Sequence, residues 1–432
     1  MQIQELYKLY LNHPSIQTDT RKLKAGDLYF ALKGPNFNGN QFAIQALADG
    51  AAYAIVDEEI DNTNNRIIKV GDVLLTLQNL ALHHRRQFIL SASEKQVPFI
   101  AVTGSNGKTT SKELIHAVLS STYKNYTTEG NLNNHIGIPL TILKIKKDAE
   151  IAIIEMGANH LKEIEGYCKY AMPTHGVITN CGKAHLEGFG SEAGIRKGKG
   201  ELFDYLKLHN GTAFVMWDYE YLQKMSAGIA NIITYGTHDA TVTGSVKNSA
   251  GLLEVSISAD AGVMIIKTNL VGEYNLPNVL LAVAIGQYFN IPDEKIKAAL
   301  ENYVPSNSRS QLIEKDSNKI ILDAYNANPS SMKAAIENFA NMDGADKVLA
   351  LGGMKELGTS SAIEHQYLID LISKFKWKNV VLVGDEFSKL KHSYLHFDNS
   401  LKAKEWYADQ NFTNTNILIK GSRSTQMEKL IE

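Results

Sequence analysis

Short apolar runs alternate with longer amphipathic stretches through the middle of this chain of 432 residues. Between residues 98 and 304 each run has the length of a strand, and a pattern with helical spacing follows it. The runs cover residues 151–154, 176–179, 213–216 and 232–235. Strands that alternate with helices favour a parallel sheet covered on both faces, so we predict such a sheet in this segment.

The same alternation returns after residue 305, where we predict a second doubly wound α/β domain. Its strand-like runs cover residues 319–324, 348–351, 380–383 and 417–419. Just before this segment, residues 241–269 change to a period of two, with Leu253, Val255 and Ile257 on one side. A period of two predicts an antiparallel insertion at this position.

The first segment has shorter runs, at 27–32 and 52–56, with turn-rich residues 34–39 between them. A helical pattern over residues 74–90 closes it, and residues 91–98 read as a linker. We predict a small α/β domain here and place the domain boundaries at 1–97, 98–304 and 305–432. Residues 83–86, His-His-Arg-Arg, are interpreted as a solvated helix end rather than a metal cluster, because cations at a helix C-terminus complement its dipole.

Composition narrows the class of protein. The formal net charge of −2 and the pI near 6.7 give no electrostatic footprint for nucleic acid. The two cysteines, Cys168 and Cys181, fit small buried side chains in a reducing compartment better than a disulfide framework. The start lacks a basic region, and no apolar run is long enough to span a bilayer. We therefore expect a cytoplasmic enzyme without nucleic-acid partners or membrane insertion.

A glycine-rich turn joins the first strand of the central segment to a helix. An apolar run at 99–102 enters the sequence Thr-Gly-Ser-Asn-Gly-Lys-Thr-Thr at 103–110, and an amphipathic pattern follows. Backbone N–H groups and the helix dipole at such a turn point at a bound anion, Lys108 adds a charge, and Thr109 can ligate Mg²⁺. We predict that this loop binds nucleotide phosphates.

The loop is a variant of the general phosphate-binding pattern. Val102 stands where that pattern has its first glycine, which leaves Gly104 and Gly107 as the glycines of the loop. A Gly-Lys pair also occurs at helix C-caps, and a purely structural turn is the alternative interpretation. In this chain the helical pattern follows the pair instead of preceding it, which favours phosphate binding.

Two further strand ends carry polar groups. Glu155 follows the run at 151–154, and His185 lies just beyond the run at 176–179. Ligands in such sheets bind beyond the carboxyl ends of the strands. A carboxylate on a neighbouring strand is where an ATPase places a Mg²⁺ ligand. His185 is less expected because Mg²⁺ prefers oxygen, so an ordinary loop histidine is the open alternative.

Lys199 lies in the middle of an apolar stripe. It follows Ile195 by four residues and precedes Leu202 by three, in a helix predicted over 191–206. A charged lysine on a buried helix face is unfavourable unless a contact or a chemical change compensates its charge. It could extend past the core, pair with a carboxylate such as Glu155, or react with CO₂ to become an anionic carbamate. The reaction with CO₂ needs the neutral amine. For an ordinary lysine at pH 7, less than about 0.1% of side chains are in this neutral form, and burial raises that fraction.

Together these pieces resemble the Mur ligase superfamily, the ATP-dependent amide-forming enzymes of peptidoglycan synthesis. Residues 103–110 match its phosphate loop, and the likeness covers essentially the whole chain. The other stretches that carry it are 19–21, 26–34, 130–139, 323–329, 353–358 and 420–423. The resemblance implies an α/β protein of three domains: a small N-terminal substrate domain, a central P-loop-type parallel-sheet ATPase domain and a C-terminal Rossmann-like domain.

The resemblance also implies roles in an ATP site, with Lys108, Lys199, His185 and Arg309 as catalytic residues. Thr109 would hold one Mg²⁺, and Glu155 and His185 a second, together with a CO₂-derived carbamate on Lys199. Arg309 would reach phosphate across a closing cleft. ATP would be bound by Gly104, Ser105, Asn106, Gly107, Lys108, Thr109, Thr110, Asn275, Asn278, Arg309 and Asp323.

Within the superfamily, the Tyr-Asn-Ala-Asn-Pro turn at 325–329 is typical of the branch that joins D-alanyl-D-alanine to UDP-N-acetylmuramoyl-tripeptide. The implied enzyme is a monomer that works through an acyl phosphate. The implied substrate-binding residues are Thr20, Arg21, Lys33, Asn133, Asn134, Tyr325 and Asn326. Asn38 and Asn40 depart from the aspartate and histidine that family members show.

Other classes share parts of this pattern. Another carboxylate–amine ligase, such as a third-residue adding enzyme or a folylpolyglutamate synthase, keeps the same ATP site. The third-residue enzymes show an Asp-Asn-Pro-Arg signature, which the sequence lacks. A P-loop switch or transport ATPase would have no lysine at the position of Lys199. A sugar-nucleotide binder without enzymatic activity would not turn over ATP.

Overall fold

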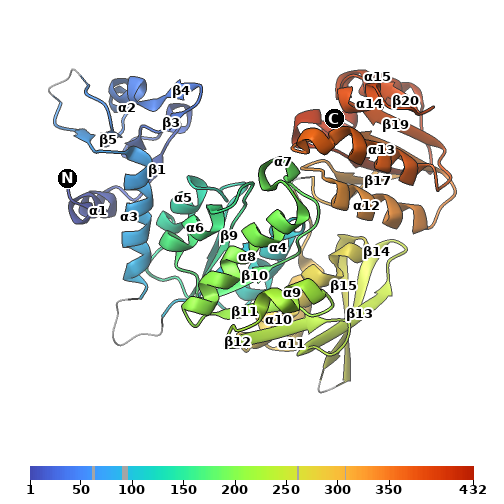
Figure 1. Cartoon of the computed structure of the whole chain (residues 1–432), viewed down its shortest axis with the longest axis horizontal. Coiled ribbons are helices and arrows are strands. Elements are labelled where there is room, and N and C mark those ends of the chain that lie inside the picture. Colours follow the sequence, from blue (N-terminus) through green and yellow to red (C-terminus); the bar gives the residue numbers. More distant parts are fainter. Residues whose placement is uncertain (61–63, 90–95, 260–261, 307) are drawn as a thin grey trace. The chain divides into compact units, whose positions relative to one another are not determined.

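The computed structural model describes residues 1–60, 64–89, 96–259, 262–306 and 308–432, so Leu90 and residues 91–95 of the predicted linker lie outside the described part. The chain separates into two compact units. Figure 1 shows the helices and strands of both, coloured along the sequence. The first comprises residues 1–101, 123–158 and 162–175, and the second comprises 102–122, 159–161 and 176–432. Strand β7 (Phe99–Thr103) belongs to both, because the division falls after Ala101.

The N-terminal part of the first unit is a parallel sheet with the order β1-β2-β5-β6. Two of its strands lie within the predicted runs at 27–32 and 52–56. The turn-rich residues 34–39 take part in a short antiparallel pair, β3 with β4. The elements of this part are α1 (Ile3–Asn12), β1 (Ile16–Gln17), β2 (Leu28–Phe30), β3 (Lys33–Gly34), β4 (Phe37–Asn38), α2 (Ala43–Ala48), β5 (Tyr53–Val56), β6 (Ile67–Lys69) and α3 (Val73–Gln87).

The end of α3 is buried, so the interpretation of residues 83–86 as a solvated helix end is wrong for its central pair. His84 is 4% exposed, with Nδ1 at 2.9 Å from the Tyr7 hydroxyl and Nε2 at 2.7 Å from the carbonyl of Ile145. Burial lowers the pKa of His84, and this ring therefore serves as a neutral hydrogen-bonding group inside the first unit.

Arg85 is fully buried, and its side chain caps the C-terminal end of a different helix. Its Nε and Nη2 donate to the carbonyls of Ala171 and Met172, each at 3.0 Å, at the C-terminal end of α6 (Glu163–Ala171). Its guanidinium lies 3.7 Å from the ring centroid of Phe99. The cation therefore complements the dipole of α6 rather than that of its own helix.

Strand β7 organises the central part of the chain. In the first unit, the amide of Ala152 donates to the carbonyl of Pro98 just before β7, and β8 (Asn125–Thr127) pairs in parallel with β9 (Ile151–Glu155). In the second unit the amide of Thr179 donates to the carbonyl of Thr103, at the end of β7. The helices of the first unit in this part are α5 (Gly137–Leu143) and α6.

In the second unit the strand order is β15-β14-β13-β12-β11-β10, followed by the end of β7. The predicted antiparallel insertion is confirmed, because β14 pairs antiparallel with both β13 and β15. Leu253, Val255 and Ile257 on β14 are all fully buried. The bounds are β10 (His175–Ile178), β11 (Thr212–Met216), β12 (Asn231–Gly236), β13 (Val242–Asn248), β14 (Leu252–Ala259) and β15 (Gly262–Val271).

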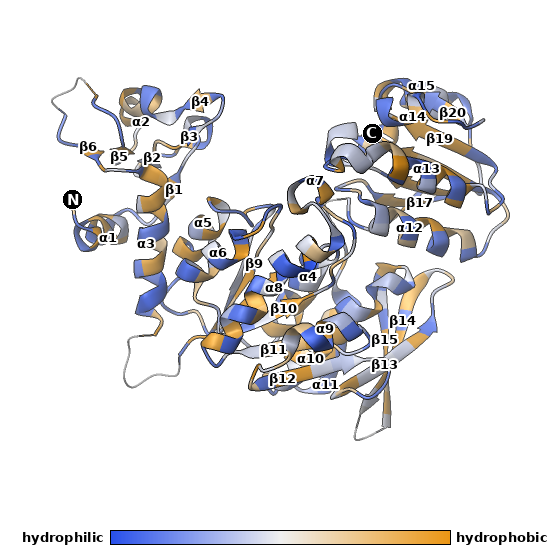
Figure 2. Cartoon of the chain, in the orientation of Figure 1, coloured by the Kyte–Doolittle hydropathy of each residue, from blue (hydrophilic) through white to orange (hydrophobic). Residues whose placement is uncertain are grey.

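The C-terminal sheet has the order β16-β17-β21-β18-β19-β20 and is parallel except for the hairpin of β16 and β17. Alternate residues of β18 enter two cores, Leu349 with Phe339 of α12 and Val348 with Ala403 of α15. Both faces are therefore covered, as predicted, and the strands are hydrophobic (Figure 2). The bounds are β16 (Gln311–Lys315), β17 (Asn318–Asp323), β18 (Lys347–Gly352), β19 (Asn379–Val383), β20 (Leu395–Phe397) and β21 (Asn416–Lys420).

The helices of the second unit follow the predicted alternation, and α10 and α11 both pack on α4. Their bounds are α4 (Lys108–Ser120), α7 (Leu186–Phe189), α8 (Glu192–Leu208), α9 (Glu220–Ser226), α10 (Leu276–Tyr288), α11 (Asp293–Asn302), α12 (Pro329–Asn341), α13 (Ser361–Ile372), α14 (Asp385–Ser388) and α15 (Ser400–Asp409).

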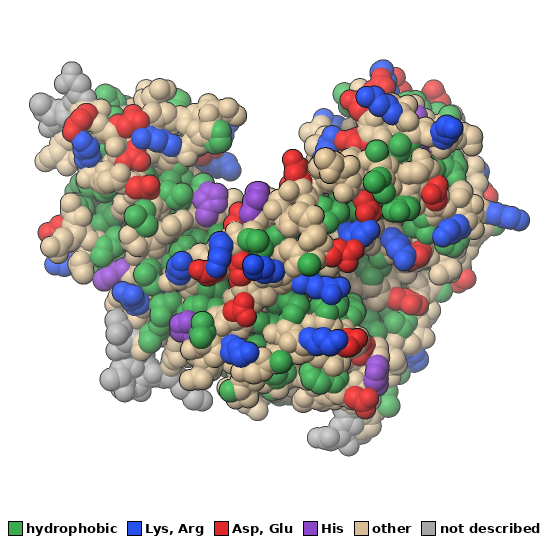
Figure 3. Space-filling model, viewed as in Figure 1, with side chains coloured by type: hydrophobic (Ala, Val, Ile, Leu, Met, Phe, Trp, Pro, Cys, Tyr) green, Lys and Arg blue, Asp and Glu red, His purple; other side chains and the backbone are tan. Residues whose placement is uncertain are grey.

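The distribution of charged side chains on the surface and the burial of the two cysteines are consistent with the expectations drawn from composition. Figure 3 shows acidic and basic side chains mixed over one face of the molecule. Cys168 and Cys181 are both buried, as predicted, and they are not joined in a disulfide. Within the described ranges, every helix is too short or too polar to cross a membrane.

His175 on β10 gives a pH-dependent test of the fold. It is 9% exposed, and burial lowers its pKa to about 4, whereas the unfolded chain takes up the proton near pH 6.5. Because the unfolded state binds more protons between these values, stability falls as the pH falls from about 6.5 to 4. Between pH 7 and pH 5, we expect the free energy of unfolding of His175→Gln to fall by about 2 kcal/mol less than that of the wild type, as measured by urea unfolding. Equal decreases in the free energy of unfolding of the two proteins would contradict the lowered pKa of His175.

Candidate active site

The glycine loop begins where the buried strand β7 ends and α4 starts. Gly104 has φ +140°, and a Cβ there would lie 2.0 Å from Oγ1 of Thr179. Gly107 has φ +79°, and its Cβ would lie 2.7 Å from Oδ1 of Asn278. Only glycine fits such backbone positions without strain. Since the helix begins at Lys108, directly after Gly107, the C-cap alternative is excluded.

Hydrogen bonds from the end of β10 hold the loop in place. Oγ1 of Thr179 donates to the carbonyl of Asn106 at 2.6 Å, and the amide of Asn106 donates to Oδ1 of Asn180 at 3.1 Å. Oγ of Ser105 donates to the carbonyl of Gly182 at 2.6 Å. The loop is thus fixed from one side by a neighbouring strand end, and it leads into a helix start, where backbone amides favour an anion.

Lys108 folds back over the loop. Its Nζ donates to the carbonyls of Gly104 at 2.8 Å and Ser105 at 3.2 Å. Thr109, the next residue in the helix, is 8% exposed. Lys108 and Thr109 therefore both lie on the first turn of α4, where the positive end of the helix dipole adds to the lysine charge.

Glu155 ends β9 in the first unit and is 1% exposed. Its Oε1 accepts a hydrogen bond of 2.8 Å from Nδ2 of Asn133, and its backbone amide donates to Oγ1 of Thr128 at 3.0 Å. The structure thus joins Glu155 to the loop at 130–137, in which Oδ1 of Asn134 accepts from the amides of Ile136 and Gly137. No spacing or motif in the sequence indicates the pairing of Glu155 with Asn133.

His185 lies in a left-handed conformation, with φ 54°, at the start of α7 in the second unit. Its Nδ1 contacts the carboxylate of Glu356, and the proximity of His185 lowers the pKa of Glu356. This contact of Glu356 with His185 was not predicted, although Glu356 lies in the family-like stretch at 353–358. Its own φ of 62° marks a constrained turn.

Lys199 is fully buried on α8, as its place in the apolar stripe predicts. Its Nζ lies 5.1 Å from the ring centroid of Phe189. Within the part of the chain that the structure describes, no three His, Cys, Asp or Glu side chains form a metal-binding group. Thr109, His185 and Lys199 belong to the second unit, whereas Glu155 belongs to the first.

Asn275 and Asn278 are buried at the start of α10, where Pro277 stands in the first turn, as predicted. Nδ2 of Asn278 donates to Oδ1 of Asn275 at 2.8 Å, and Oδ1 of Asn278 accepts from Oγ of Ser111 at 2.9 Å. The pair therefore connects α10 to the helix that carries the glycine loop.

Asp323 ends β17 and forms the centre of a polar cluster. Its Oδ2 pairs with Nζ of Lys420 at 2.5 Å, and its Oδ1 accepts from the amide of Ser310 at 3.3 Å. Lys420 is 2% exposed at the end of β21, and its burial as a cation was not predicted. The guanidinium of Arg309 lies 3.6 Å from the ring centroid of Tyr325, so Arg309 is half-buried and stacked rather than fully solvated.

Asn106 of the glycine loop also contacts the C-terminal sheet region. Nδ2 of Asn328, the N-cap of α12, donates to Oδ1 of Asn106 at 2.7 Å. Asn326 lies two residues earlier, and its carbonyl is 3.4 Å from Nζ of Lys420. Within the second unit, the loop thus meets the turn that carries the predicted substrate residues Tyr325 and Asn326.

The predicted residues of the N-terminal sheet lie in charged networks. Arg21 forms a two-point contact with Asp19, at 2.9 and 2.8 Å, beside Thr20 in the same turn. Nζ of Lys33 lies 2.9 Å from both Asp57 and Glu58.

The departures at Asn38 and Asn40 are part of the same network. Nδ2 of Asn40 donates to Asp57 at 2.8 Å, and Nδ2 of Asn38 donates to Glu58 at 3.0 Å. These asparagines therefore hold the two carboxylates that also face Lys33.

Comparison with known proteins shows three consecutive family matches. The model described as Mur ligase family, catalytic domain, matches residues 14–99; Mur ligase middle domain matches 102–286; and Mur ligase, glutamate ligase domain, matches 308–423. The three matches confirm the predicted three-domain α/β class.

Full-length relatives agree with these matches. The UDP-N-acetylmuramoyl-tripeptide–D-alanyl-D-alanine ligase of Bacillus subtilis (strain 168) is 34% identical, covering 96% of this chain and 92% of the relative. A crystal structure of MurF from Acinetobacter baumannii has a TM-score of 0.86 at 32% identity, with 96% and 92% covered. The MurF ligase from Thermotoga maritima in complex with ADP has a TM-score of 0.86 at 27% identity, with 98% and 97% covered.

The glycine loop gives a prediction with a matched control. Gly104→Ala combines a positive φ with a clash against Thr179, whereas Gly26→Ala has φ +91° and no heavy atom within 4 Å of the new Cβ. We expect urea unfolding to show that Gly104→Ala loses about 1–3 kcal/mol more stability than Gly26→Ala, because only the first overpacks its surroundings. Equal losses would show that Thr179 moves away without cost and does not fix the loop.

Proposed function

Because the chain belongs to the Mur ligase family, we propose that it is an ADP-forming ligase that joins D-alanyl-D-alanine to UDP-N-acetylmuramoyl-tripeptide. The observation that carries this proposal is the 34% identity to a ligase of that name over 96% of the chain. The geometry supports its nucleotide half, since a phosphate-type loop starts α4 and a relative of the same fold holds ADP.

The reaction has two steps. An oxygen of the tripeptide's terminal carboxylate attacks the γ-phosphorus of ATP, the bond from that phosphorus to the bridging oxygen breaks, and ADP leaves with the electron pair. The amine of D-alanyl-D-alanine then attacks the acyl carbon, loses a proton, and expels inorganic phosphate. Because phosphoryl transfer needs little covalent help from a protein, positioning and charge stabilisation carry the catalysis.

The first turn of α4 supplies the charge for the phosphates. The helix-start amides after Gly107 and the Nζ of Lys108 form the positive surface, and Thr179 and Asn180 keep the loop in this conformation. In the proposed complex, Lys108 exchanges its contacts with the loop carbonyls for contacts with phosphate oxygens. Such preorganised donors stabilise the charge that develops on the transferring group.

The residues proposed to hold Mg²⁺ have suitable chemistry. Thr109 offers a hydroxyl on the first turn of α4, and Glu155 offers a carboxylate that is almost fully buried, where a cation compensates its charge. Mg²⁺ commonly takes one or two protein oxygens and completes its shell with phosphates and water, so a larger acidic cluster is not required. When bound, the ion neutralises charge on the phosphate oxygens. His185 is proposed as a further ligand.

Lys199 is the proposed site of a carbamate. Its complete burial favours the neutral amine that reacts with CO₂, and the product is an anion suited to metal binding. In forming it, the Lys199 nitrogen bonds to the carbon of CO₂ and releases one proton.

Substrate recognition is proposed to involve all three segments. Thr20, Arg21 and Lys33 would contact the uridine diphosphate, and the loop with Asn133 and Asn134 the sugar. Tyr325 and Asn326 would lie near the peptide end. Asn275, Asn278 and Asp323 are proposed on the adenosine side, where their existing hydrogen bonds fix their orientation.

A third-residue adding ligase or a folylpolyglutamate synthase is the alternative with the same ATP chemistry. The full-length relative named above is a ligase for D-alanyl-D-alanine, which favours the first assignment.

The function is tested by phosphate release from ATP. We expect release to require both UDP-N-acetylmuramoyl-tripeptide and D-alanyl-D-alanine, with a UDP-muramoyl-pentapeptide as product, identified by mass spectrometry. Release that ignores D-alanyl-D-alanine but responds to glutamate or a diamino acid would reject the substrate assignment and keep the ATP site.

Arg309→Ala tests a positioning role in phosphate binding. We expect kcat to fall at least about tenfold, because the planar guanidinium of Arg309 would contact phosphate at two points in the proposed complex. The thermal unfolding midpoint should change little, because the side chain is only half-buried. Arg309→Lys, which keeps the charge without the planar fork, should recover only part of the rate. A variant with wild-type turnover and an unchanged midpoint would refute the role.

The carbamate is tested by carbon-13 NMR after equilibration with labelled bicarbonate. We expect a carbamate signal in the wild type that disappears in Lys199→Met. Lys112→Met is the matched control, because Lys112 is another buried lysine, 1% exposed, paired with Glu113. A signal that persists in Lys199→Met, or that is lost only in the control, would assign the carbamate elsewhere.

A further inference from the structure

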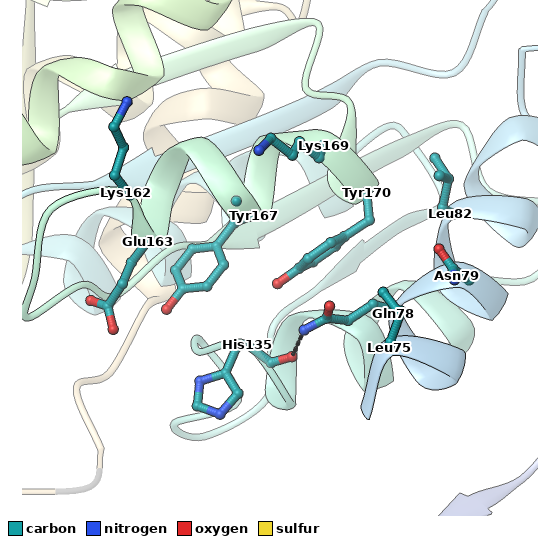
Figure 4. Close-up of a pocket in the computed structure, with 11 residues that line it drawn as sticks. Leu75, Gln78, Asn79, Leu82, His135, Lys162, Glu163, Tyr167, Lys169 and Tyr170 are labelled. Carbon is teal, nitrogen blue, oxygen red and sulfur yellow. Dashed lines mark hydrogen bonds between the residues drawn. The ribbon is translucent and has the colours of Figure 1, made fainter. Parts of the chain in front are cut away.

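A pocket of about 430 Å³ lies between α3 and α6 in the first unit, beside His135 (Figure 4). This volume is in the range of small-molecule sites. Its walls are largely apolar, with Leu75 and Leu82 from α3 and the ring of Tyr167 from α6. None of the residues assigned above to ATP, metal or substrate lines it.

The hydroxyl of Tyr170 lacks a partner at this pocket. Tyr170 is 7% exposed, and its Oη is buried without a hydrogen-bond partner among the described residues. Figure 4 shows the hydroxyl directed into the space between Tyr167 and Gln78. Burial raises the pKa of Tyr170, so the group stays protonated and can donate. A buried donor without a partner is unfavourable, and an acceptor on a bound molecule would remove that cost.

Gly166 keeps the pocket open. It lies inside α6, where glycine is less favourable than alanine. Its φ is not in the left-handed range, and a Cβ there would meet no heavy atom within 4 Å. Neither the backbone nor packing therefore requires a glycine. Its effect is to leave free the space that a side chain would fill, since Gly166 lines the pocket.

The two lysines that line the pocket, Lys162 and Lys169, are already paired within the chain. Glu165 accepts from Nζ of Lys162 at 2.5 Å and lies 3.5 Å from Nζ of Lys169. The amide of Gln78 is also engaged, because its Nε2 donates to the carbonyl of His135 at 3.1 Å. These pairs leave no lysine at the pocket for an anionic ligand, and the buried hydroxyl that lacks a partner among the lining residues is that of Tyr170.

We propose that this pocket binds an uncharged, planar aromatic molecule whose carbonyl oxygen accepts a hydrogen bond from Tyr170. The ring of the ligand packs against Tyr167, Leu75 and Leu82, and its carbonyl points towards the floor of the pocket. Aromatic rings prefer offset or edge-to-face contacts, which the tilt of 51° between the rings of Tyr167 and Tyr170 allows.

Benzamide is the probe that tests this site, with the full chain and without ATP or peptidoglycan precursors. We expect saturable one-site binding in ligand-observed NMR and calorimetry. Gly166→Leu should abolish binding by filling the pocket. Tyr170→Phe should weaken binding about fivefold, the size of one hydrogen bond, while its thermal unfolding midpoint stays equal or rises because the unpaired hydroxyl is gone.

Tyr126→Phe is the matched control, because the Tyr126 hydroxyl is outside the pocket and donates to Asp148 at 3.1 Å. It should leave the affinity for benzamide unchanged. The proposal is overturned if benzamide does not bind saturably to the wild type, or if Gly166→Leu or Tyr170→Phe binds it as tightly as the wild type. If Gly166→Leu fails to fold, the affinity of Tyr170→Phe for benzamide alone tests the proposal. Because no nucleotide is present, these outcomes do not depend on the proposed ligase activity.

Discussion

The turn from β7 into α4 is the constraint on which the rest of the site depends. The strand before it is completely buried, and the two glycines in it have backbone conformations in which a side chain would collide with Thr179 or Asn278. Neighbouring elements of the second unit therefore fix the loop from two sides, the end of β10 and the start of α10. A loop held in this way keeps its helix-start amides in one orientation, and preorganised donors of this kind are the condition for the electrostatic catalysis proposed for this site.

Much of this arrangement could be predicted from local patterns. In the second and third segments, short apolar runs indicate strands, and apolar residues at every third or fourth position indicate helices. Their alternation along the chain predicts the order of strands and helices. The burial of Lys199 follows in the same way from its distance to Ile195 and Leu202 along a helix. The turn at Gly104 and Gly107 was identified because the apolar strand, the glycines and the helix are contiguous in the sequence.

The contacts that were missed join residues far apart in the chain. Arg85 was expected to act on its own helix, yet it binds the end of α6, 86 residues away. The pairs of Asn133 with Glu155, His185 with Glu356 and Lys420 with Asp323 likewise depend on tertiary structure. No spacing in the sequence brings such side chains together. The edge strand β20 was missed because three residues carry too little pattern.

In the proposed reaction the tripeptide carboxylate attacks the γ-phosphorus of ATP. This step can be followed with UDP-N-acetylmuramoyl-tripeptide labelled with oxygen-18 in its terminal carboxylate, incubated with ATP and D-alanyl-D-alanine. We predict that one labelled oxygen appears in the inorganic phosphate for each amide formed, as measured by mass spectrometry. Amide formation with unlabelled phosphate would contradict the acyl-phosphate route, because the bridging oxygen would then have come from elsewhere.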